Sequence, residues 1–191
     1  MDIVADLMKQ VATGDNLAMI SKSVGGDGKA VQSALSMGLP MVMGSMATTA
    51  SRPGGADMLA KMLAQTGGTN PLDNMSGFLG NPAAAGGSGM VSTLFGGQMG
   101  TIQNAISQKT GLPPAAVGKV LEIAAPMVMG YVGRMFVQQK MDAAGLTSLL
   151  GEQSKAALQG SPDAAAMAQQ MLGAQAGSAG VSGILKKFVG K

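Results

Sequence analysis

Two segments of the chain carry the same core sequence, and this internal similarity limits the folds open to it. At a constant separation of 86 positions, residues 40–44 (PMVMG) are identical to residues 126–130. Six further identities keep this register: Ile20 with Ile106, Ser21 with Ser107, Gly25 with Gly111, Ala30 with Ala116, Val31 with Val117, and Leu35 with Leu121. Eleven identities in one register exceed what chance provides, even in a chain rich in Met and Gly. We therefore predict an internal duplication, spanning roughly 15–65 and 101–153, with a glycine-rich connector at 66–100.

The first copy contains residues that commonly begin and end helices. Asp15 and Asp27 can each cap a following helix, because an aspartate side chain accepts hydrogen bonds from the free N–H groups of a first turn. Gly25 can take the left-handed conformation that ends a helix. We expect the first helix to run to about Val24 and the second to about Met37.

The second copy carries equivalent signals in different residues. Gly111 can end a helix that begins near Thr101, and Pro113-Pro114 fit the first turn of the next helix, where a missing N–H costs nothing. The following apolar residues have the spacing of an amphipathic helix: Val117, Val120, Leu121 and Ala124. No stretch alternates as a half-buried strand would. The sequence thus predicts an all-α protein of two related helical repeats.

Pro40 and Pro126 lie inside apolar, helix-like sequence at the centres of the two repeats. An interior proline removes a hydrogen bond and clashes with the preceding turn, so it breaks or kinks a helix. Gly44 and Gly130, four residues further on, would let another backbone approach closely. We favour a buried corner or kink between helices as the role of these four residues. A hinge, or a break that contacts a ligand, is the alternative.

The middle of the chain lacks charge, with no Asp, Glu, Lys or Arg over 74–108. Within it, 81–89 is typical of a flexible loop, and short apolar pieces flank it. Soluble disordered segments usually carry charge, so this stretch either packs onto its own domain or is covered by a partner. Its large apolar side chains are the candidates for self-association: Phe78, Leu79, Leu94 and Phe95.

The last part of the chain forms a region of its own in this interpretation. We assign 1–155 to the helical domain and 156–191 to a C-terminal extension, with a helix at 163–174 and a short basic tail. Three lysines give only weak attraction to an anionic membrane, so a frayed soluble end is the favoured interpretation of this tail. The residues that would make a membrane contact are Lys186, Lys187 and Phe188.

Residues 30–51, bounded by Lys29 and Arg52, carry no charged side chain, and the run is long enough to span a membrane. Polar residues, Gly38 and a proline interrupt it, however, and the matching segment of the second copy carries Lys119 and Glu122. The N-terminus also has acidic residues where a signal peptide would need Lys or Arg. Buried helices of a soluble, cytoplasmic protein are therefore favoured over a membrane span.

The chain contains no His and no Cys, which removes several classes of catalytic and metal site. There is no imidazole base, no thiolate nucleophile and no cysteine ligand for zinc or an iron–sulfur cluster. The carboxylates are dispersed, and Gly25-Gly-Asp-Gly-Lys29 lacks the spacing of a phosphate-binding loop. We expect no enzymatic activity, no metal, no cofactor and no identifiable small-molecule ligand.

The positive charge is concentrated at the C-terminus. The formal net charge is +3, but three of the thirteen basic residues stand in the last six positions. Residues 1–185 therefore hold ten basic and ten acidic groups, with no basic stripe for phosphates and few aromatics for stacking on bases. Nucleic acid is not an expected partner.

The segment SQKTGLPPAAVGKVLEIAAP (107–126), the duplicated core and the glycine-rich middle resemble the bacterial YidB-like family. This family is a domain of unknown function in small, mainly helical, cytoplasmic proteins. The resemblance covers about 15–155 and is most specific at 107–134. It implies a helical fold and a bacterial source, and it assigns no catalytic residue or ligand. The high Met content and the 160–191 extension depart from the family pattern.

Taken together, these features favour a non-catalytic structural or scaffold protein that associates with itself, as a homo-oligomer or as the subunit of a filament or shell. Only 12% of residues are charged, which leaves little repulsion between copies. The alternatives are a peripheral membrane-associated protein and a monomeric adaptor of unknown partner. For the uncharged middle stretch, the alternative to an interface is that it folds back onto its own core.

Overall fold

A computed structural model describes residues 3–12, 15–66, 71–80 and 86–166 of the chain. These ranges contain helices and no strand, so the predicted all-α fold is confirmed. The α-helices are α1 (Ile3–Ala12), α2 (Asn16–Val24), α3 (Gly28–Ala50), α4 (Gly55–Thr66), α5 (Met75–Gly80), α6 (Gly87–Phe95), α7 (Met99–Thr110), α8 (Pro114–Gln138) and α9 (Ala143–Gly160). Two short 3-10 helices, η1 (Pro71–Asn74) and η3 (Gly96–Gln98), lie between them.

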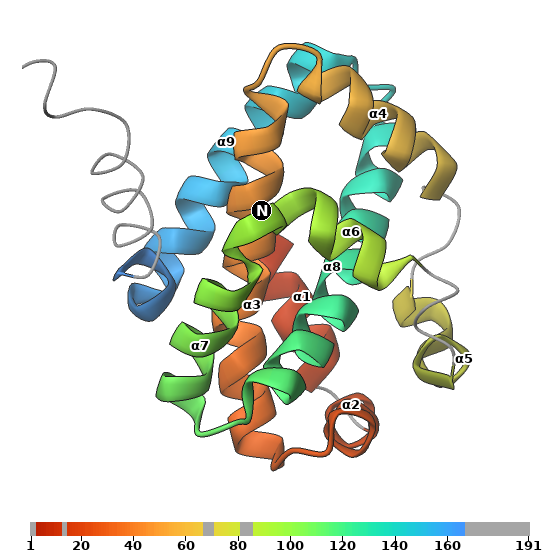
Figure 1. The fold of residues 1–191 in the computed structure, drawn as a ribbon. Coiled ribbons are helices and arrows are strands. Elements are labelled where there is room, and N and C mark those ends of the chain that lie inside the picture. The colour runs from red at the N-terminus through yellow and green to blue at the C-terminus, as the bar shows by residue number, and fades with distance from the viewer. Residues whose placement is uncertain (1–2, 13–14, 67–70, 81–85, 167–191) are drawn as a thin grey trace, which may run out of the picture.

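The two longest helices, α3 and α8, lie side by side at the centre of the molecule (Figure 1). They contain 23 and 25 residues, and most of these residues are buried. Both begin at one end of the molecule and finish at the other, while α1, α6 and α7 pack on the pair. The core is therefore built around two long apolar helices.

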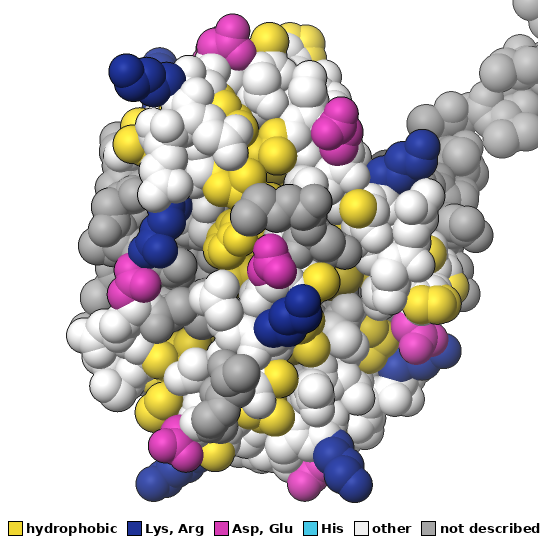
Figure 2. Space-filling model, turned by 180° about the vertical axis from the view of Figure 1, so that it is seen from behind, with side chains coloured by type: hydrophobic (Ala, Val, Ile, Leu, Met, Phe, Trp, Pro, Cys, Tyr) yellow, Lys and Arg dark blue, Asp and Glu magenta, His cyan; other side chains and the backbone are white. Residues whose placement is uncertain are grey.

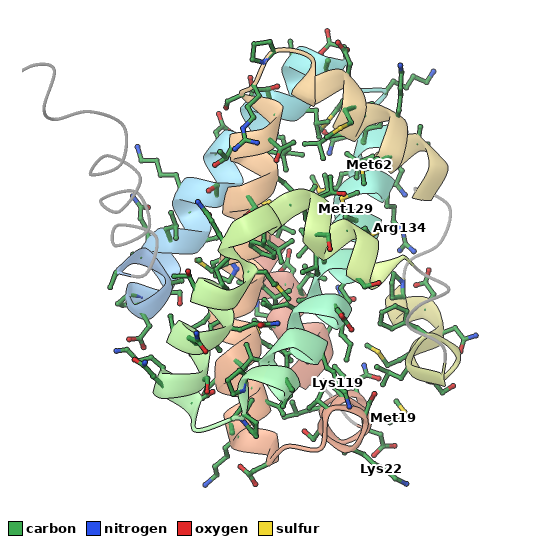
Figure 3. The ribbon with its side chains drawn as sticks, viewed as in Figure 1. Met19, Lys22, Met62, Lys119, Met129 and Arg134 are labelled. Atoms are coloured by element: carbon green, nitrogen blue, oxygen red, sulfur yellow. The ribbon has the colours of Figure 1, made fainter. Side chains whose placement is uncertain are left out.

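Methionine contributes much of this core. Met43 and Met46 of α3 and Met127 and Met129 of α8 are fully buried. Met62 of α4 packs against the same cluster and points into the region between α4 and α8, near Met129 (Figure 3). The flexible thioether side chain fills irregular space between helices, so the many methionines of this chain act mainly as core residues.

The matching sequence segments form matching helices. α2 and α3 occupy the first segment, α7 and α8 occupy the second, and α3 and α8 begin 86 positions apart. Gly25 and Gly111, which end α2 and α7, both have a left-handed φ of 74°. Their amides donate to the Ser21 and Ser107 carbonyl oxygens at 2.9 and 2.8 Å. The helices thus keep the register of the sequence match, whose origin by duplication stays a prediction.

The two halves of the chain share one core. The helices follow the same order in each half, α1 to α4 and then α6 to α9. The last helix of each half packs mainly on the long helix of the other, because α9 lies along α3 and α4 lies along α8. α9 also continues through position 155, where we placed a domain boundary, to Gly160.

Pro40 and Pro126 are buried within α3 and α8, and both helices continue unbroken past them. The expectation that the helix of the first copy ends near Met37 is wrong, because α3 runs to Ala50. The prolines therefore do not form a corner between two helices. Each leaves one backbone carbonyl, four residues earlier, without its intrahelical N–H donor.

Residues distant in sequence meet these two carbonyl groups. The Ser36 carbonyl oxygen in α3 accepts a hydrogen bond of 3.2 Å from Ser161 Oγ. The Glu122 carbonyl in α8 lies against Gly87, where an added Cβ would stand only 2.4 Å from the oxygen. Tertiary packing thus covers both carbonyl groups that lack an intrahelical N–H donor. This packing lets both apolar helices continue past their prolines.

The helix caps agree only in part with the sequence prediction. Asp27 caps α3, and its carboxylate accepts hydrogen bonds from the backbone N–H of Lys29 at 3.0 Å and of Ala30 at 3.4 Å. Asp15 stands at the start of α2, but its side chain makes no capping bond, because the backbone there is already helical. Pro114 opens α8, as predicted.

Of the described helices, α8 alone is long and apolar enough to cross a membrane, despite Lys119 and Glu122. Residues 30–51, the uncharged run considered as a membrane span from the sequence, form most of α3 and do not meet these criteria. Within the most apolar window of α8, 67% of the residues are buried inside the protein. A core helix of a soluble protein meets the same length and composition criteria.

Candidate functional site

A cavity of about 490 Å³ lies beside Pro40 and Gly44. α3 forms one wall, the end of α6 together with η3 forms another, and α9 contributes to a third. Its lining residues are Pro40, Met41, Gly44, Ser45, Thr48, Thr49 and Arg52 from α3 and the segment after it, residues 93–98 from α6 and η3, and Ser154 and Leu158 from α9. This volume falls in the range of small-molecule sites, about 300–1,000 Å³.

The α3 wall changes in polarity along its length. It is apolar at Pro40 and Met41, bears hydroxyl groups at Ser45 and Thr49, and reaches the exposed Arg52 beyond the helix. At 1.5 Å per residue the helical part of this wall, from Pro40 to Thr49, is about 14 Å long. Arg52 is the single charged residue in the lining, and no ion pair holds it in the part of the chain that the structure describes.

The hydroxyl groups of the lining fall into two sets. Thr48 and Thr93 each donate within their own helix, to the Gly44 and Gly89 carbonyl oxygens at 2.9 Å. Ser45 and Ser154 make no side-chain hydrogen bond to the described residues. These two hydroxyl groups are available to a molecule in the cavity.

Gly44 does not bring two backbones together as expected. A Cβ on Gly44 would lie 3.5 Å from Ser154 Oγ, which is an ordinary contact distance. The tighter approach is at Gly38, where a Cβ would lie 3.1 Å from Leu121 Cδ2 across the α3–α8 contact. Gly130 is buried within α8. Gly38 meets only a side chain there, so the close backbone approach expected at Gly44 is found instead at Gly87, beside the Glu122 carbonyl group.

The structure buries the residues that we proposed for self-association. Phe78, Leu94 and Phe95 are each at most 9% exposed, and Leu79 is partly buried against the same core. Phe78 and Leu79 belong to α5, which packs on α2, whereas Leu94 and Phe95 belong to α6, which packs on α8. These side chains form no shared exposed patch, so the uncharged stretch folds onto its own domain where it is described.

The C-terminal region is described only at its beginning. Residues 162–166 are helical and overlap the start of the helix expected at 163–174, and Asp163 forms an exposed ion pair of 2.9 Å with Lys109. Lys186, Lys187 and Phe188 lie outside the described residues. The start of the extension therefore packs on the helical domain.

The charged side chains of the described residues are dispersed over the surface (Figure 2). No group of three potential metal ligands occurs among the described residues. Charged side chains are scattered over the face seen in Figure 2, and Arg134 lies well apart from Lys22 and Lys119 in Figure 3. Arg134 pairs with Asp73 at the surface. A surface ion pair of this kind contributes little to stability, about 0–1 kcal/mol.

Tyr131 is the one titratable group with a resolved shift in the described part of the chain. Burial raises its pKa above the ordinary value of 10.0, and the nearby Asp6 carboxylate adds to the rise. Its hydroxyl donates to Asp6 Oδ2 at 3.4 Å and so links α8 to α1. A tyrosine with a raised pKa stays neutral near pH 7, which suits a structural contact.

The fold and the cavity define an all-α protein with one two-helix core and a small polar-to-apolar pocket. Residues 6–135 match a bacterial family of proteins of unknown function, DUF937, and the chain belongs to that family. The YidB-like resemblance agrees with this membership. No curated protein and no solved structure matches the chain.

Sequence reasoning alone did not find the cavity. Its three walls come from helices that are distant in the chain, and no short motif marks them. A signal was nevertheless present in the internal match. Small hydroxyl residues, Ser45 and Thr49, stand in the first copy where the second has Tyr131 and Met135.

Proposed function

We propose that this protein is a non-catalytic structural protein that associates with itself. The observation that carries the proposal is its sparse and balanced charge, with 12% of residues charged and ten basic against ten acidic groups over 1–185. Net charge keeps copies of a soluble protein apart. A nearly neutral chain leaves little repulsion to prevent association, and the lack of His and Cys supports a role without catalysis.

We place the contact at the end of the molecule where α3 and α8 finish. The exposed large apolar side chains of the described residues are Met58, 41% exposed, and Val137, 53% exposed. Met58 is near the start of α4 and Val137 near the end of α8, and both helix ends lie at this end of the molecule (Figure 1). Asp57 and Lys140, close to them in sequence, would contribute a polar rim.

This placement replaces the surface first considered. Phe95 is 4% exposed, so its side chain cannot contact another copy without local unfolding. Phe95→Asp would bury a charge in the core and would test folding rather than association. Met58 and Val137 can be changed without that complication, because both are exposed.

Sedimentation velocity on three proteins tests the placement: wild type, the double variant Met58→Asp with Val137→Asp, and the control Thr101→Asp. Thr101 is exposed on α7, away from the proposed contact. We expect the double variant to dissociate assemblies that the control leaves intact, while both keep the helical circular dichroism of the wild type. If assemblies persist in the double variant, the contact does not lie at Met58 and Val137.

A further inference from the structure

We propose that the cavity beside Pro40 binds a single-chain organic carboxylate, with its apolar chain at the Pro40 end and its carboxylate at Arg52. Nothing in the proposed self-association requires this ligand, so the two proposals can fail separately. The inference rests on the space that α3 leaves, on the charge at one end of that space, and on the free hydroxyl groups between.

The space arises from small residues in one copy of the internal match. α3 and α8 share the register of 86 positions, so Ser45 and Thr49 correspond to Tyr131 and Met135. In α8, Tyr131 reaches across to Asp6 of α1. α6 holds the place in the second half that α1 holds in the first. Ser45, the residue of α3 that corresponds to Tyr131, is much smaller and ends in a hydroxyl group. The cavity beside α6 occupies the volume that a tyrosine side chain would fill.

The charge of the lining selects an anion. Among the described residues, Arg52 is the single charged residue in the lining, no carboxylate lines the cavity, and no acidic group pairs with Arg52. A guanidinium group binds a carboxylate through two parallel hydrogen bonds. The Ser45 and Ser154 hydroxyl groups, which have no acceptor among the described residues, can donate to the same ligand.

The Pro40 end of the cavity is suited to the apolar part of the ligand. Pro40 and Met41 offer apolar surface there, and Leu94, Phe95 and Leu158 add apolar residues to the lining. The α3 residues that line the cavity of about 490 Å³ run from Pro40 to Arg52, and an extended chain spans this length better than a compact ring system does. A fatty acid of medium length therefore matches both the polarity gradient and the volume.

Isothermal titration calorimetry with decanoate, and with decanol as its uncharged analogue, tests the proposal on the full chain. We expect one saturable decanoate site per chain and an affinity for decanoate higher than for decanol. Arg52→Gln should weaken decanoate binding about tenfold, the equivalent of one charge-assisted interaction, and leave decanol unchanged. Arg134→Gln, at the other arginine of the chain, is the matched control and should leave both affinities unchanged.

A second variant fills the space with the residue of the other copy. Ser45→Tyr should abolish binding of both probes while the helical signal and the melting temperature stay near those of wild type. If this variant does not fold, the exposed Arg52→Gln comparison still decides. The proposal is overturned if decanoate shows no saturable binding, if Arg52→Gln binds it as tightly as wild type, or if a folded Ser45→Tyr variant retains the site.

Discussion

Ser161 donates a hydrogen bond to the carbonyl oxygen of Ser36, the one group in α3 that Pro40 leaves without an N–H donor. The two serines are 125 positions apart. The bond ties the residue after α9 to the middle of α3, and it explains in part how an apolar helix passes through a proline. The same element, α9, forms one wall of the cavity beside Pro40.

This relationship predicts a coupling between Ser161 and Pro40. Ser161→Ala should lower the free energy of unfolding by about 0.5–1.5 kcal/mol, the usual worth of one intramolecular hydrogen bond. In a Pro40→Ala background the restored N–H of residue 40 can serve the Ser36 carbonyl, so the second substitution should have a smaller effect. Urea unfolding of the four proteins measures the coupling. Equal losses in both backgrounds would contradict this role for Ser161.

Gly87 offers a test at the other proline. Gly87→Ala should destabilise the protein by about 1–3 kcal/mol, because the new methyl group would meet the Glu122 carbonyl oxygen at 2.4 Å. Gly89→Ala, two residues later on α6, is the control. No atom lies within 4 Å of its added Cβ, so replacing a helical glycine there should stabilise by up to about 1 kcal/mol. Thermal melts that rank the two variants in the reverse order would show that α6 does not pack on α8 as described.

The two candidate N-caps should differ in importance. Asp27→Ala removes an acceptor for two backbone N–H groups of α3 and should cost about 1 kcal/mol. Asp15→Ala removes no capping bond, so its effect on the free energy of unfolding should be close to zero. Chemical denaturation of both variants provides the comparison, and equal destabilisation would contradict the assignment of Asp27 alone as a cap.

Tyr131 can be observed directly, because the chain has one Tyr and no Trp. Its ultraviolet absorbance should titrate above pH 10.0, and Asp6→Asn should lower the pKa while burial keeps part of the rise. Since the folded pKa exceeds the unfolded one, the stabilisation from neutral Tyr131 is complete below the unfolded pKa. It is lost as the pH rises through the folded pKa. If Asp6→Asn left the pKa of Tyr131 unchanged, the Asp6 carboxylate would not contribute to the rise.

The sequence predicted the parts of this fold that local chemistry decides. Gly25, Gly111 and Pro114 mark helix ends by their own conformational preferences, and they do so in the structure. The end of α3 was predicted wrongly because Pro40 is a local signal to stop. That signal is overruled by Ser161 and by burial against α8, which no short stretch of sequence contains.

The cavity is harder to predict for the same reason. It depends on α9 lying along α3 rather than along α8, which is a matter of tertiary packing. Phe95 shows the converse error. Its position in an uncharged, glycine-rich stretch suggested exposure, yet α6 packs on α8 and places this ring in the core.

The mass of the protein in solution shows whether copies of the chain associate. Size-exclusion chromatography with light scattering at tens of micromolar measures it on the wild-type chain. We expect a discrete species at a multiple of 18.9 kDa that persists at high salt, because the proposed contact is mainly apolar. A single species near 18.9 kDa across this concentration range would contradict it.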